Sequence, residues 1–318
     1  MTQTTQNPAT PGSGAVSTTS AVVVRGLRVR YGDFEAVRGI DLDIRRGEVF
    51  ALLGTNGAGK TTTLDVLSGF GAPSTGDVTV LGMDPRTRPP ALRARMGVQQ
   101  QDGGFVEELT VLETLQLWQR LVERPDRPER LIDRFELGAK RDVAVGKLSG
   151  GEQRRLDLAL AVWGSPELVI LDEPTTGLDP ESRRRTWDAI QELQEAGRTI
   201  LLTTHYLEEA EALAERVAIM HEGRIAVAGS LSEIVAKQPA RFSATLPVNP
   251  PALPRLDGWV EVVANRVTVQ SGDLQRDLTT FLAWADAYGV RLDDLRAAPA
   301  SLADIYHSIR TELSQETS

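Results

Sequence analysis

The sequence predicts an α/β protein that carries a smaller α+β domain at its C-terminal end. Three observations favour this fold. Between about residues 21 and 238, short β-rich runs alternate with helical patterns, which is typical of a parallel sheet covered by helices on both faces. A mostly helical block, from about 102 to 147, interrupts this alternation. From about 239 to 318 the pattern changes to a hairpin followed by helices.

The chain begins with a segment that is predicted to be disordered. Residues 1–20 are mainly Thr, Ser, Gln, Pro, Gly and Ala, with neither the basic start nor the apolar centre of a signal peptide. Antiparallel strands are expected next, because short β-rich runs are separated by glycine-containing turns. These runs are Ala21–Val24, Leu27–Tyr31, Ile40–Ile44 and Val49–Leu53.

The remaining elements follow from the spacing of apolar residues. A strand is predicted at Val78–Val80, and leucines recur at helical spacing within the helical block. The elements predicted after this block are a helix from Gly150 to Trp163, a strand from Leu168 to Leu171, a helix from Pro180 to Ala196, a strand from Thr199 to Thr203 and a helix from Leu207 to Val217. The C-terminal domain is predicted to contain a hairpin of Trp259–Val263 and Val267–Gln270, a helix that includes Leu274 and Ala285, and a last helix from Ser301.

Composition excludes several classes of protein. The chain has 318 residues and 41% apolar content, which is enough to fill a core. It contains no cysteine, and this excludes disulfides and thiolate metal sites. A formal net charge of −9 without a basic block argues against nucleic acid as the main ligand. No run approaches the ~18 apolar residues that a membrane helix needs.

The segment from Gly54 to Thr61 reads GTNGAGKT, with a strand-like run before it and a helix-like run after it. Glycines in such a loop let consecutive backbone N–H groups approach phosphate oxygens at a helix N-terminus. Lys60 is then expected over the β- and γ-phosphates, and the Thr61 hydroxyl on Mg²⁺. The structural alternative is a flexible glycine-rich turn between a strand and a helix.

Two carboxylates follow the predicted strand Leu168–Leu171. Open α/β folds bind ligands at the carboxyl ends of their strands, so Asp172 is placed to complete the Mg²⁺ shell with Thr61. Glu173 is placed to take a proton from the water that attacks the γ-phosphate. An ordinary solvated strand end is the structural alternative for this Asp-Glu-Pro segment.

Two further polar residues follow strands near the same edge. His205 comes after the strand Thr199–Thr203, where an imidazole can hydrogen-bond a γ-phosphate, although a lone histidine is more often structural. Gln101 carries little weight by itself. Ser149, Gly150 and Gly151 precede another predicted helix, so they form a second anion-binding helix end or, equally, an ordinary capping box with Glu152.

Together these motifs resemble the ATP-binding subunit of an ABC transporter. Residues 54–61 look like its Walker A motif, LSGGEQ at 148–153 its signature, LVILDEP at 168–174 its Walker B, TTGLD at 175–179 its D-loop and TTH at 203–205 its switch histidine. Gln101 matches the Q-loop glutamine, and Tyr31 matches the aromatic residue that stacks on adenine. Tyr31 keeps an alternative as a strand aromatic that packs on its neighbours.

The resemblance implies a P-loop NTPase of ABC type, in which a mixed central sheet is joined by an antiparallel β subdomain and an inserted helical subdomain. It implies ATP and Mg²⁺ as cofactors, with Thr61, Gln101 and Asp172 at the metal and Glu173, His205 and Gln101 as catalytic residues. The nucleotide-binding residues that it implies are Tyr31, Gly54, Asn56, Gly57, Gly59, Lys60, Thr61, Thr62, Ser149, Gly150, Gly151 and Asp179.

In this family two ATP-binding domains pair head to tail, so the resemblance implies a homodimer in which Ser149 and Gly151 contact the partner's γ-phosphate. The segment 203–211 resembles the drug-exporter type related to daunorubicin resistance, which implies a separate membrane permease and a position on the cytoplasmic face of the membrane. Ala303 departs from that group, where an acidic residue is usual. Alternatives are a soluble ABC ATPase that acts on ribosomes or DNA, and a non-catalytic nucleotide-dependent regulator. The role of residues 239–318 stays open between a dimer brace and a regulator.

Overall fold

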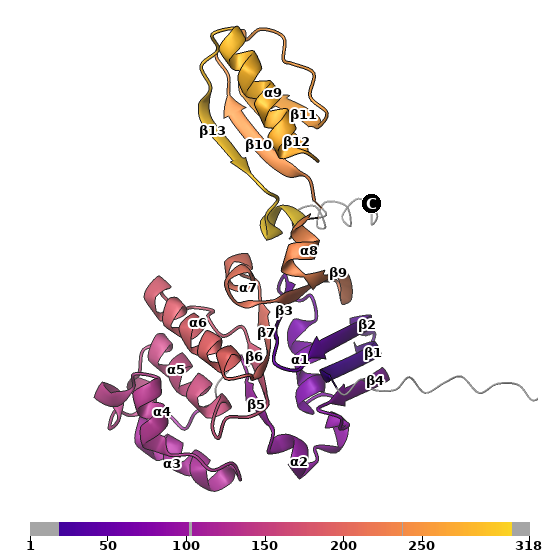
Figure 1. Cartoon of the computed structure of the whole chain (residues 1–318). Helices are drawn as coiled ribbons and strands as arrows, with labels where there is room; N and C mark the ends of the chain where they lie inside the picture. The colour runs from indigo at the N-terminus through magenta and orange to yellow at the C-terminus, as the bar shows by residue number, and fades with distance from the viewer. Residues whose placement is uncertain (1–18, 102–103, 237, 307–318) are drawn as a thin grey trace, which may run out of the picture.

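Three β-sheets organise the residues that this computed structural model describes, 19–101, 104–236 and 238–306 (Figure 1). The central sheet has six strands in the order β5-β6-β7-β3-β8-β9. The first five strands are parallel, and β9 is antiparallel to β8. Their bounds are β3 Val49–Gly54, β5 Met96–Gln99, β6 Leu168–Asp172, β7 Thr199–Thr204, β8 Arg216–His221 and β9 Arg224–Ser230. The predicted mixed sheet is therefore confirmed.

A second, antiparallel sheet of three strands lies beside α1 (Figure 1). Its strands are β2 Phe34–Arg45, β1 Ser20–Tyr31 and β4 Thr75–Val80. Two runs that the sequence predicts separately form the single strand β1, which shifts register after Val24. Gly26 absorbs this irregularity with a φ of 57°, a value that glycine adopts without strain. Residues 1–18 of the predicted tail lie outside the described residues.

Helices cover both faces of the central sheet, as the alternation of elements predicts. The longer ones are α1 Lys60–Ser68, α5 Gly150–Ala161, α6 Pro180–Glu195 and α7 Leu207–Leu213, and the shorter ones are α2 Pro90–Arg93 and α8 Leu231–Ala236. The helical block contains α3 Val111–Leu121 and α4 Pro128–Arg134. Thr110 and Glu113 form a reciprocal capping box at the start of α3.

Two predictions about these helices are wrong in part. The helix predicted over Leu207–Val217 ends at Leu213, because Arg216 and Val217 pair with Phe50 and Ala51 in the sheet. This pairing buries Val217 completely and outweighs local helical spacing. The end of the helical block forms single 3₁₀ turns at Gly138–Lys140 and Val145–Lys147 instead of a regular helix.

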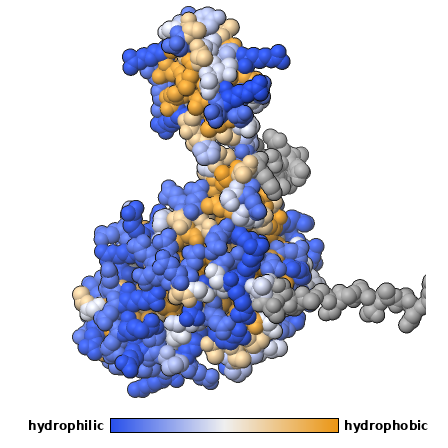
Figure 2. Space-filling model, viewed as in Figure 1, coloured by the Kyte–Doolittle hydropathy of each residue, from blue (hydrophilic) through white to orange (hydrophobic). Residues whose placement is uncertain are grey.

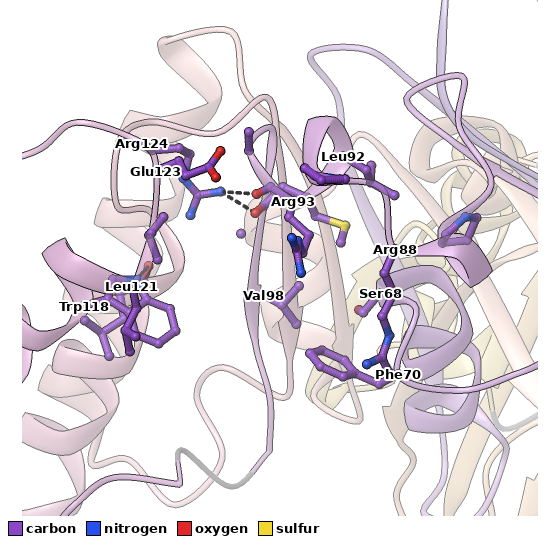
Figure 3. Close-up of a pocket in the computed structure, with 17 residues that line it drawn as sticks. Ser68, Phe70, Arg88, Leu92, Arg93, Val98, Trp118, Leu121, Glu123 and Arg124 are labelled. Atoms are coloured by element: carbon purple, nitrogen blue, oxygen red, sulfur yellow. Dashed lines mark hydrogen bonds between the residues drawn. The ribbon is translucent and has the colours of Figure 1, made fainter.

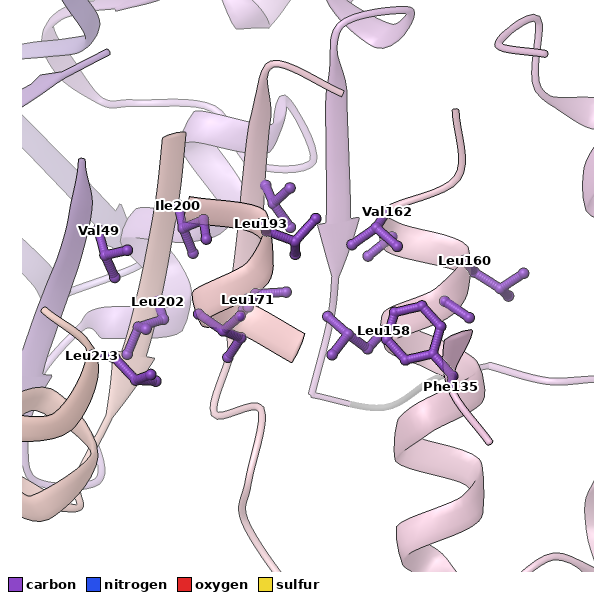
Figure 4. Close-up of a cluster of buried hydrophobic side chains, with 14 of the residues drawn as sticks. Val49, Phe135, Leu158, Leu160, Val162, Leu171, Leu193, Ile200, Leu202 and Leu213 are labelled. Atoms are coloured by element: carbon purple, nitrogen blue, oxygen red, sulfur yellow. The ribbon is translucent and has the colours of Figure 1, made fainter. Parts of the chain in front are cut away.

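The core lies on both faces of the central sheet. Alternate residues of β3 enter different clusters: Val49, Ala51 and Leu53 pack with α5, α6 and α7, whereas Phe50 and Leu52 pack with α1 and the three-stranded sheet. Figure 4 shows part of the first cluster, to which Leu158 of α5, Val162 just after that helix, Leu171 and Leu193 all belong. All six residues of β3 are buried, so this strand is held rigidly at the site described below.

The C-terminal residues form a third sheet, which stands apart from the other two in Figure 1. Its strand order is β11-β12-β10-β13, with β10 Ala240–Thr245, β11 Trp259–Val263, β12 Arg266–Ser271 and β13 Asp293–Ala298. Helix α9, Leu274–Ala287, covers one face through a cluster that includes Phe242, Phe281 and Trp284. The predicted hairpin and helix are confirmed, but β13 was not predicted, because all six of its residues are exposed and carry no apolar alternation.

After β13 the chain returns to the part of the molecule that contains the first two sheets, which we call the larger domain. Residues 302–306 are helical, and the rest of the helix predicted from Ser301 lies outside the described residues. Leu302 and Ile305 are fully buried in the same cluster as Leu213 and Ile234. Figure 2 shows that the visible face of the larger domain is mostly hydrophilic. In the part of the chain described here, no helix combines the length and apolar character needed to cross a membrane.

Candidate functional site

Three neighbouring parallel strands bring the predicted site residues to one edge of the central sheet. In the register of the sheet, Leu53 is paired with Thr204, and Asp172 with Thr203. The loop after β3, the carboxylates after β6 and His205 after β7 therefore begin side by side. This is the edge at which open α/β sheets bind ligands.

The loop from Gly54 to Gly59 has the geometry of an anion-binding loop. Gly57 and Gly59 have φ values of 80° and 101°, which favour glycine. A Cβ atom at Gly54 would lie 2.6 Å from the Met220 oxygen, and one at Gly59 would lie 2.5 Å from the Ala36 oxygen. Helix α1 starts at Lys60 without a side-chain cap, so its first N–H groups are available to an anion.

Lys60 and Glu173 form a buried ion pair at the centre of this edge. The Lys60 Nζ atom lies 3.2 Å from Glu173 Oε1 and donates to the carbonyl oxygens of Gly54 and Thr55 at 2.9 and 3.2 Å. His205 Nδ1 lies 3.4 Å from the same Glu173 oxygen. Burial raises the pKa of Glu173, but Lys60 and His205 lower it by more, so the net pKa lies below the usual value. Glu173 is therefore ionised at neutral pH, as a proton acceptor must be.

The backbone of Glu173 lies in the left-handed region, with a φ of 48°. Its N–H donates to Thr203 Oγ1 at 3.0 Å, and its second carboxylate oxygen accepts from Thr176 Oγ1 at 3.1 Å. A left-handed conformation costs a non-glycine residue roughly 1–2 kcal/mol. Such strain persists only where surrounding contacts fix it, and it is frequent at functional sites.

Thr61, Asp172 and Gln101 line one cavity of about 300 Å³ beside α1. Asp172 is 3% exposed and accepts a hydrogen bond from Thr203 Oγ1, which fixes its carboxylate. A hydroxyl, a carboxylate and an amide oxygen are hard oxygen ligands of the kind that Mg²⁺ prefers. No cluster of three or more His, Asp or Glu side chains suited to a metal occurs among the described residues. With one hydroxyl, one carboxylate and one amide oxygen, Thr61, Asp172 and Gln101 fit a magnesium ion that completes its shell with water or phosphate oxygens.

Ser149, Gly150 and Gly151 form the N-terminus of α5, where the first two are exposed and Gly151 is half-buried. The Ser149 hydroxyl accepts from the Glu152 N–H, and Glu152 accepts from the Ser149 N–H at 2.8 Å, so the predicted capping box is confirmed. A Cβ atom at Gly151 would lie 2.9 Å from Ser182 Oγ. Within one chain, the described residues show no hydrogen bond between this helix end and the loop before α1.

The other predicted nucleotide-binding residues are exposed, except for Thr62. Tyr31 ends β1 and is 58% exposed. Asn56 is exposed in the loop, and Thr62 lies half-buried in the first turn of α1. Asp179 caps α6 by accepting from the N–H groups of Glu181 and Ser182, each at 3.0 Å. A helix cap thus explains Asp179 without a ligand, and its contact with nucleotide stays a prediction.

Two charged residues at this edge, one half-buried and one buried, were not predicted. Arg154 donates to main-chain carbonyls after β5 and β6. Glu209 is fully buried in α7 and accepts from Thr175 Oγ1 at 2.8 Å and Trp187 Nε1 at 3.1 Å. Burial is the main reason that the pKa of Glu209 is raised. Neither residue carries a sequence signal, because Arg and Glu are ordinary helix formers and only the tertiary structure shows their burial.

A second cavity, of about 440 Å³, separates the helical block from α2 and β5. Trp118 and Leu121 of α3 lie on one side of it, opposite Phe70 and Val98 (Figure 3). Leu121 is 66% exposed and Phe70 is 55% exposed. Arg124 closes one end by donating to the carbonyl oxygens of Arg93 and Met96. This groove is apolar at its rim and borders the β5 strand that leads to Gln101.

Comparison of the sequence with known proteins identifies a family and several relatives. A family model described as ABC transporter matches residues 37–176, and a model described as ABC transporter domain-containing protein-like, C-terminal domain matches residues 240–301. A daunorubicin resistance ATP-binding protein of Streptomyces coeruleorubidus is 36% identical, over 90% of this chain and 94% of its own length. A daunorubicin/doxorubicin resistance ATP-binding protein of Streptomyces peucetius is 42% identical over 68% of this chain and 67% of its own length. A Nod factor export ATP-binding protein of Ralstonia nicotianae is 39% identical over 71% of each chain.

Solved structures agree with the sequence comparisons. The structure of an ATP-binding subunit of an ABC transporter is 29% identical, with a TM-score of 0.63 over 68% of this chain and 92% of that chain. A dimeric bacterial ABC transporter cassette is 22% identical, with a TM-score of 0.59 over 66% of this chain and 98% of that chain. At that identity the second likeness concerns the fold alone.

Proposed function

This chain belongs to the family of ABC transporter ATP-binding proteins, and from this premise we propose that two copies of it bind and hydrolyse ATP together to drive a separate membrane permease. The cargo class that we propose is a drug, an antibiotic or another hydrophobic compound moving outward. Relatives whose names specify daunorubicin resistance and Nod factor export support an export role.

The observation that carries the proposal is the buried Lys60–Glu173 pair at the mouth of the glycine loop. Lys60 and the first N–H groups of α1 are placed to hold the terminal phosphates of ATP. A phosphate oxygen at Lys60 would compete with the Glu173 carboxylate for the ammonium, and this frees Glu173 to accept a proton from water. His205, close to the same carboxylate oxygen, is placed to bond the γ-phosphate.

The residues that we propose for magnesium are Thr61, Asp172 and Gln101. When bound, the ion neutralises charge that develops on the phosphates. Asp172 is the charged ligand of this set, and its hydrogen bond from Thr203 orients the carboxylate before any ligand arrives. Val98 of β5 lines both the cavity that contains these residues and the apolar groove, so β5 and the loop after it connect the metal site to that groove.

Two copies are proposed because each chain has one glycine loop and one unpartnered α5 N-terminus. Ser149 is exposed and Gly151 half-buried at that N-terminus, where N–H groups and the helix dipole favour an anion. The γ-phosphate held by one chain would satisfy this helix end of the other. ADP lacks the γ-phosphate, so closure of the dimer would depend on ATP.

We propose that the permease docks in the groove shown in Figure 3. Its apolar rim, formed by Phe70 and Leu121, suits a short amphipathic segment from the cytoplasmic side of a membrane protein. The groove lies between the helical block and β5, so movement at Gln101 can reach the docked segment. The chain would then work at the cytoplasmic face of the membrane through this partner.

The test combines light scattering with phosphate release. With ATP and Mg²⁺, the Glu173→Gln variant is expected to form a stable dimer and to hydrolyse roughly 10²–10⁴-fold more slowly than the unaltered protein, because the general base is lost. The unaltered protein is expected to release phosphate, and more so with its permease in vesicles.

Two results would contradict this proposal. Hydrolysis at the unaltered rate by Glu173→Gln would remove Glu173 as the base. A chain that stays monomeric in Glu173→Gln with saturating ATP and Mg²⁺ would remove the shared site. Replacement of exposed Leu121 by Arg serves as the permease control, since it is expected to abolish co-purification with the permease while ATP binding persists.

A further inference from the structure

The guanidinium group of Arg154 donates hydrogen bonds to main-chain carbonyl oxygens of two separate segments. Its Nε donates to the Pro174 oxygen at 3.1 Å, its Nη2 to the oxygens of Asp172 and Glu173 at 2.9 and 2.5 Å, and its Nη1 to the Gln101 oxygen at 3.0 Å. The Arg154 side chain is only 12% exposed. All three guanidinium nitrogens of Arg154 thus donate to backbone carbonyl oxygens at or next to the candidate catalytic residues.

The first of these segments is the turn that carries Glu173. Three consecutive carbonyl groups, from Asp172 to Pro174, accept hydrogen bonds from Arg154, and the middle residue, Glu173, has a left-handed backbone. Carbonyl groups turned away from regular structure need donors. The planar fork of an arginine matches several acceptors at once, whereas lysine offers one point charge.

The second segment is the loop after β5. Gln101 has its carbonyl on the same guanidinium, and its side chain is a candidate magnesium ligand. Strands β5 and β6 are neighbours in the sheet. Arg154 donates hydrogen bonds to the segments that follow both strands and so links them. One side chain therefore links the main chain at the candidate base to the main chain at a candidate metal ligand.

The nearby acid does not account for this arrangement. Asp157 lies one turn further along α5, and its Oδ2 is 3.7 Å from Arg154 Nη1, beyond hydrogen-bond range. The same Oδ2 atom makes no hydrogen bond among the described residues. The carbonyls, and not the carboxylate, therefore set the orientation of the guanidinium.

We propose that Arg154 is a positioning residue for hydrolysis: it holds the Glu173 turn and the Gln101 loop in register without touching nucleotide. The expected fall in kcat rests on the proposed function, but the expected loosening of the main chain around Glu173 does not. Loss of Arg154 is expected to let the strained turn relax and move the Glu173 carboxylate away from the attacking water, while Lys60 and the glycine loop continue to bind ATP.

The experiment compares Arg154→Ala, Arg154→Lys and a matched control, Arg155→Ala. Arg155 is the next residue of the same helix, and its Nε donates to the Phe135 oxygen in the helical block, away from the site. Full-length protein is used throughout. Amide hydrogen exchange of the nucleotide-free protein is measured at residues 172–176, and kcat, KM and the Kd of ATP are measured with Mg²⁺.

Arg154→Ala is expected to exchange at least tenfold faster at residues 172–176 and to lose roughly 10–100-fold in kcat, less than the loss expected for removal of the base itself. Its Kd for ATP is expected to stay within about twofold of the unaltered value. Arg154→Lys is expected to lie between Arg154→Ala and the unaltered protein in kcat, and Arg155→Ala to match the unaltered protein in both readouts.

Two outcomes would overturn the inference. Unchanged exchange at residues 172–176 in Arg154→Ala would show that the turn does not depend on Arg154, whatever the ATPase result. Equal losses in ATP affinity and kcat would assign Arg154 to general folding. If exchange rises as expected but the unaltered protein releases no phosphate even with its permease, the positioning of the main chain stands and the proposed function fails.

Discussion

At the scale of single residues, the site depends on charges that are buried together. Lys60 is 5% exposed and Glu173 is 8% exposed, so each needs the other while both are shielded from water. Removal of one partner leaves an uncompensated buried charge, which is more costly than the pair itself is worth. We expect replacement of Lys60 to weaken ATP binding, and replacement of Glu173 to slow hydrolysis.

Replacement of Lys60 by Ala is expected to weaken ATP binding by at least about 100-fold, because a buried charge contact to phosphate is worth several kcal/mol. Isothermal titration with ATP and Mg²⁺ measures this loss. Lys147→Ala is the control, since Lys147 is exposed and should keep its affinity. ATP binding of Lys60→Ala at the unaltered affinity would exclude the glycine loop as the phosphate site.

Asp157 provides a prediction about pH. Burial, only partly offset by Arg154, raises the pKa of Asp157 from 3.8 to about 6. Between about pH 4 and 6 the folded state then binds more protons than the unfolded state, so the free energy of unfolding falls as pH rises through this window. The free energy of unfolding that is lost in this window is not regained at higher pH.

Replacement of Asp157 by Asn should remove this loss. The variant is expected to gain roughly 1–3 kcal/mol over the unaltered protein at pH 8 and little at pH 4, from about 1.4 kcal/mol per unit of pKa shift. Urea unfolding at the two pH values measures the difference. A gain of the same size at both pH values would show that ionisation of Asp157 is not its cause.

At the scale of elements, two helices share one capping device but differ in surroundings. Thr110 caps α3 and Ser149 caps α5, each in a reciprocal box with a glutamate three residues later. The sequence therefore predicts both helix starts equally well. Of these two helices, α5 alone begins with two glycines, Gly150 and Gly151. Because glycine has no side chain, the N–H groups there stay accessible to a ligand.

Ser149→Arg is expected to prevent ATP-dependent dimerisation while a single chain still binds nucleotide, because a long side chain would fill the space for the partner's phosphate. Thr110→Arg is the matched control: it should cost about 1 kcal/mol of stability through its cap and leave dimerisation intact. Analytical ultracentrifugation in the Glu173→Gln background measures both. Dimers of unaltered stability in Ser149→Arg would place the interface elsewhere.

At the scale of the whole molecule, a short return segment after β13 packs the C-terminal residues against the larger domain. The third sheet has its own core around Phe242 and Phe281, and the division of the chain near residue 239 is our proposal. Leu302 and Ile305 nevertheless belong to the core beside α7, the helix that follows His205. The Leu302 N–H also donates to Glu211 of α7 at 3.1 Å.

Leu302→Ala is expected to lower the free energy of unfolding of the larger domain by roughly 2–4 kcal/mol, the usual cost of a large-to-small change in a core. Leu295→Ala is the control, because Leu295 is 40% exposed and should change stability by less than about 0.5 kcal/mol. Denaturant unfolding, followed by the fluorescence of buried Trp163, measures both. Equal stabilities would mean that the return segment is not part of the folded core.

Much of the fold was predictable because local pattern and tertiary environment agree. The strand before the glycine loop, the helix after it and the capped start of α5 all follow from residues within one or two turns. Predictions failed where distant pairing decides the element: β8 forms because Arg216 and Val217 meet β3, and β13 forms beside β10 from residues with no apolar alternation. Local spacing carries no information about such partners.

The sequence by itself determined the α/β class, the ATP-binding family and the residues of the glycine loop, because these depend on residue types at short, fixed spacings. Only the tertiary structure decided that Lys60, Glu173 and His205 meet, that Glu173 is strained, and that Arg154 joins two loops. These features arise from contacts between residues that lie from 19 positions apart, as Arg154 and Glu173 do, to 173 − 60 = 113 apart, as Lys60 and Glu173 do. Their energies come from burial and from convergent hydrogen bonds, neither of which a linear pattern specifies.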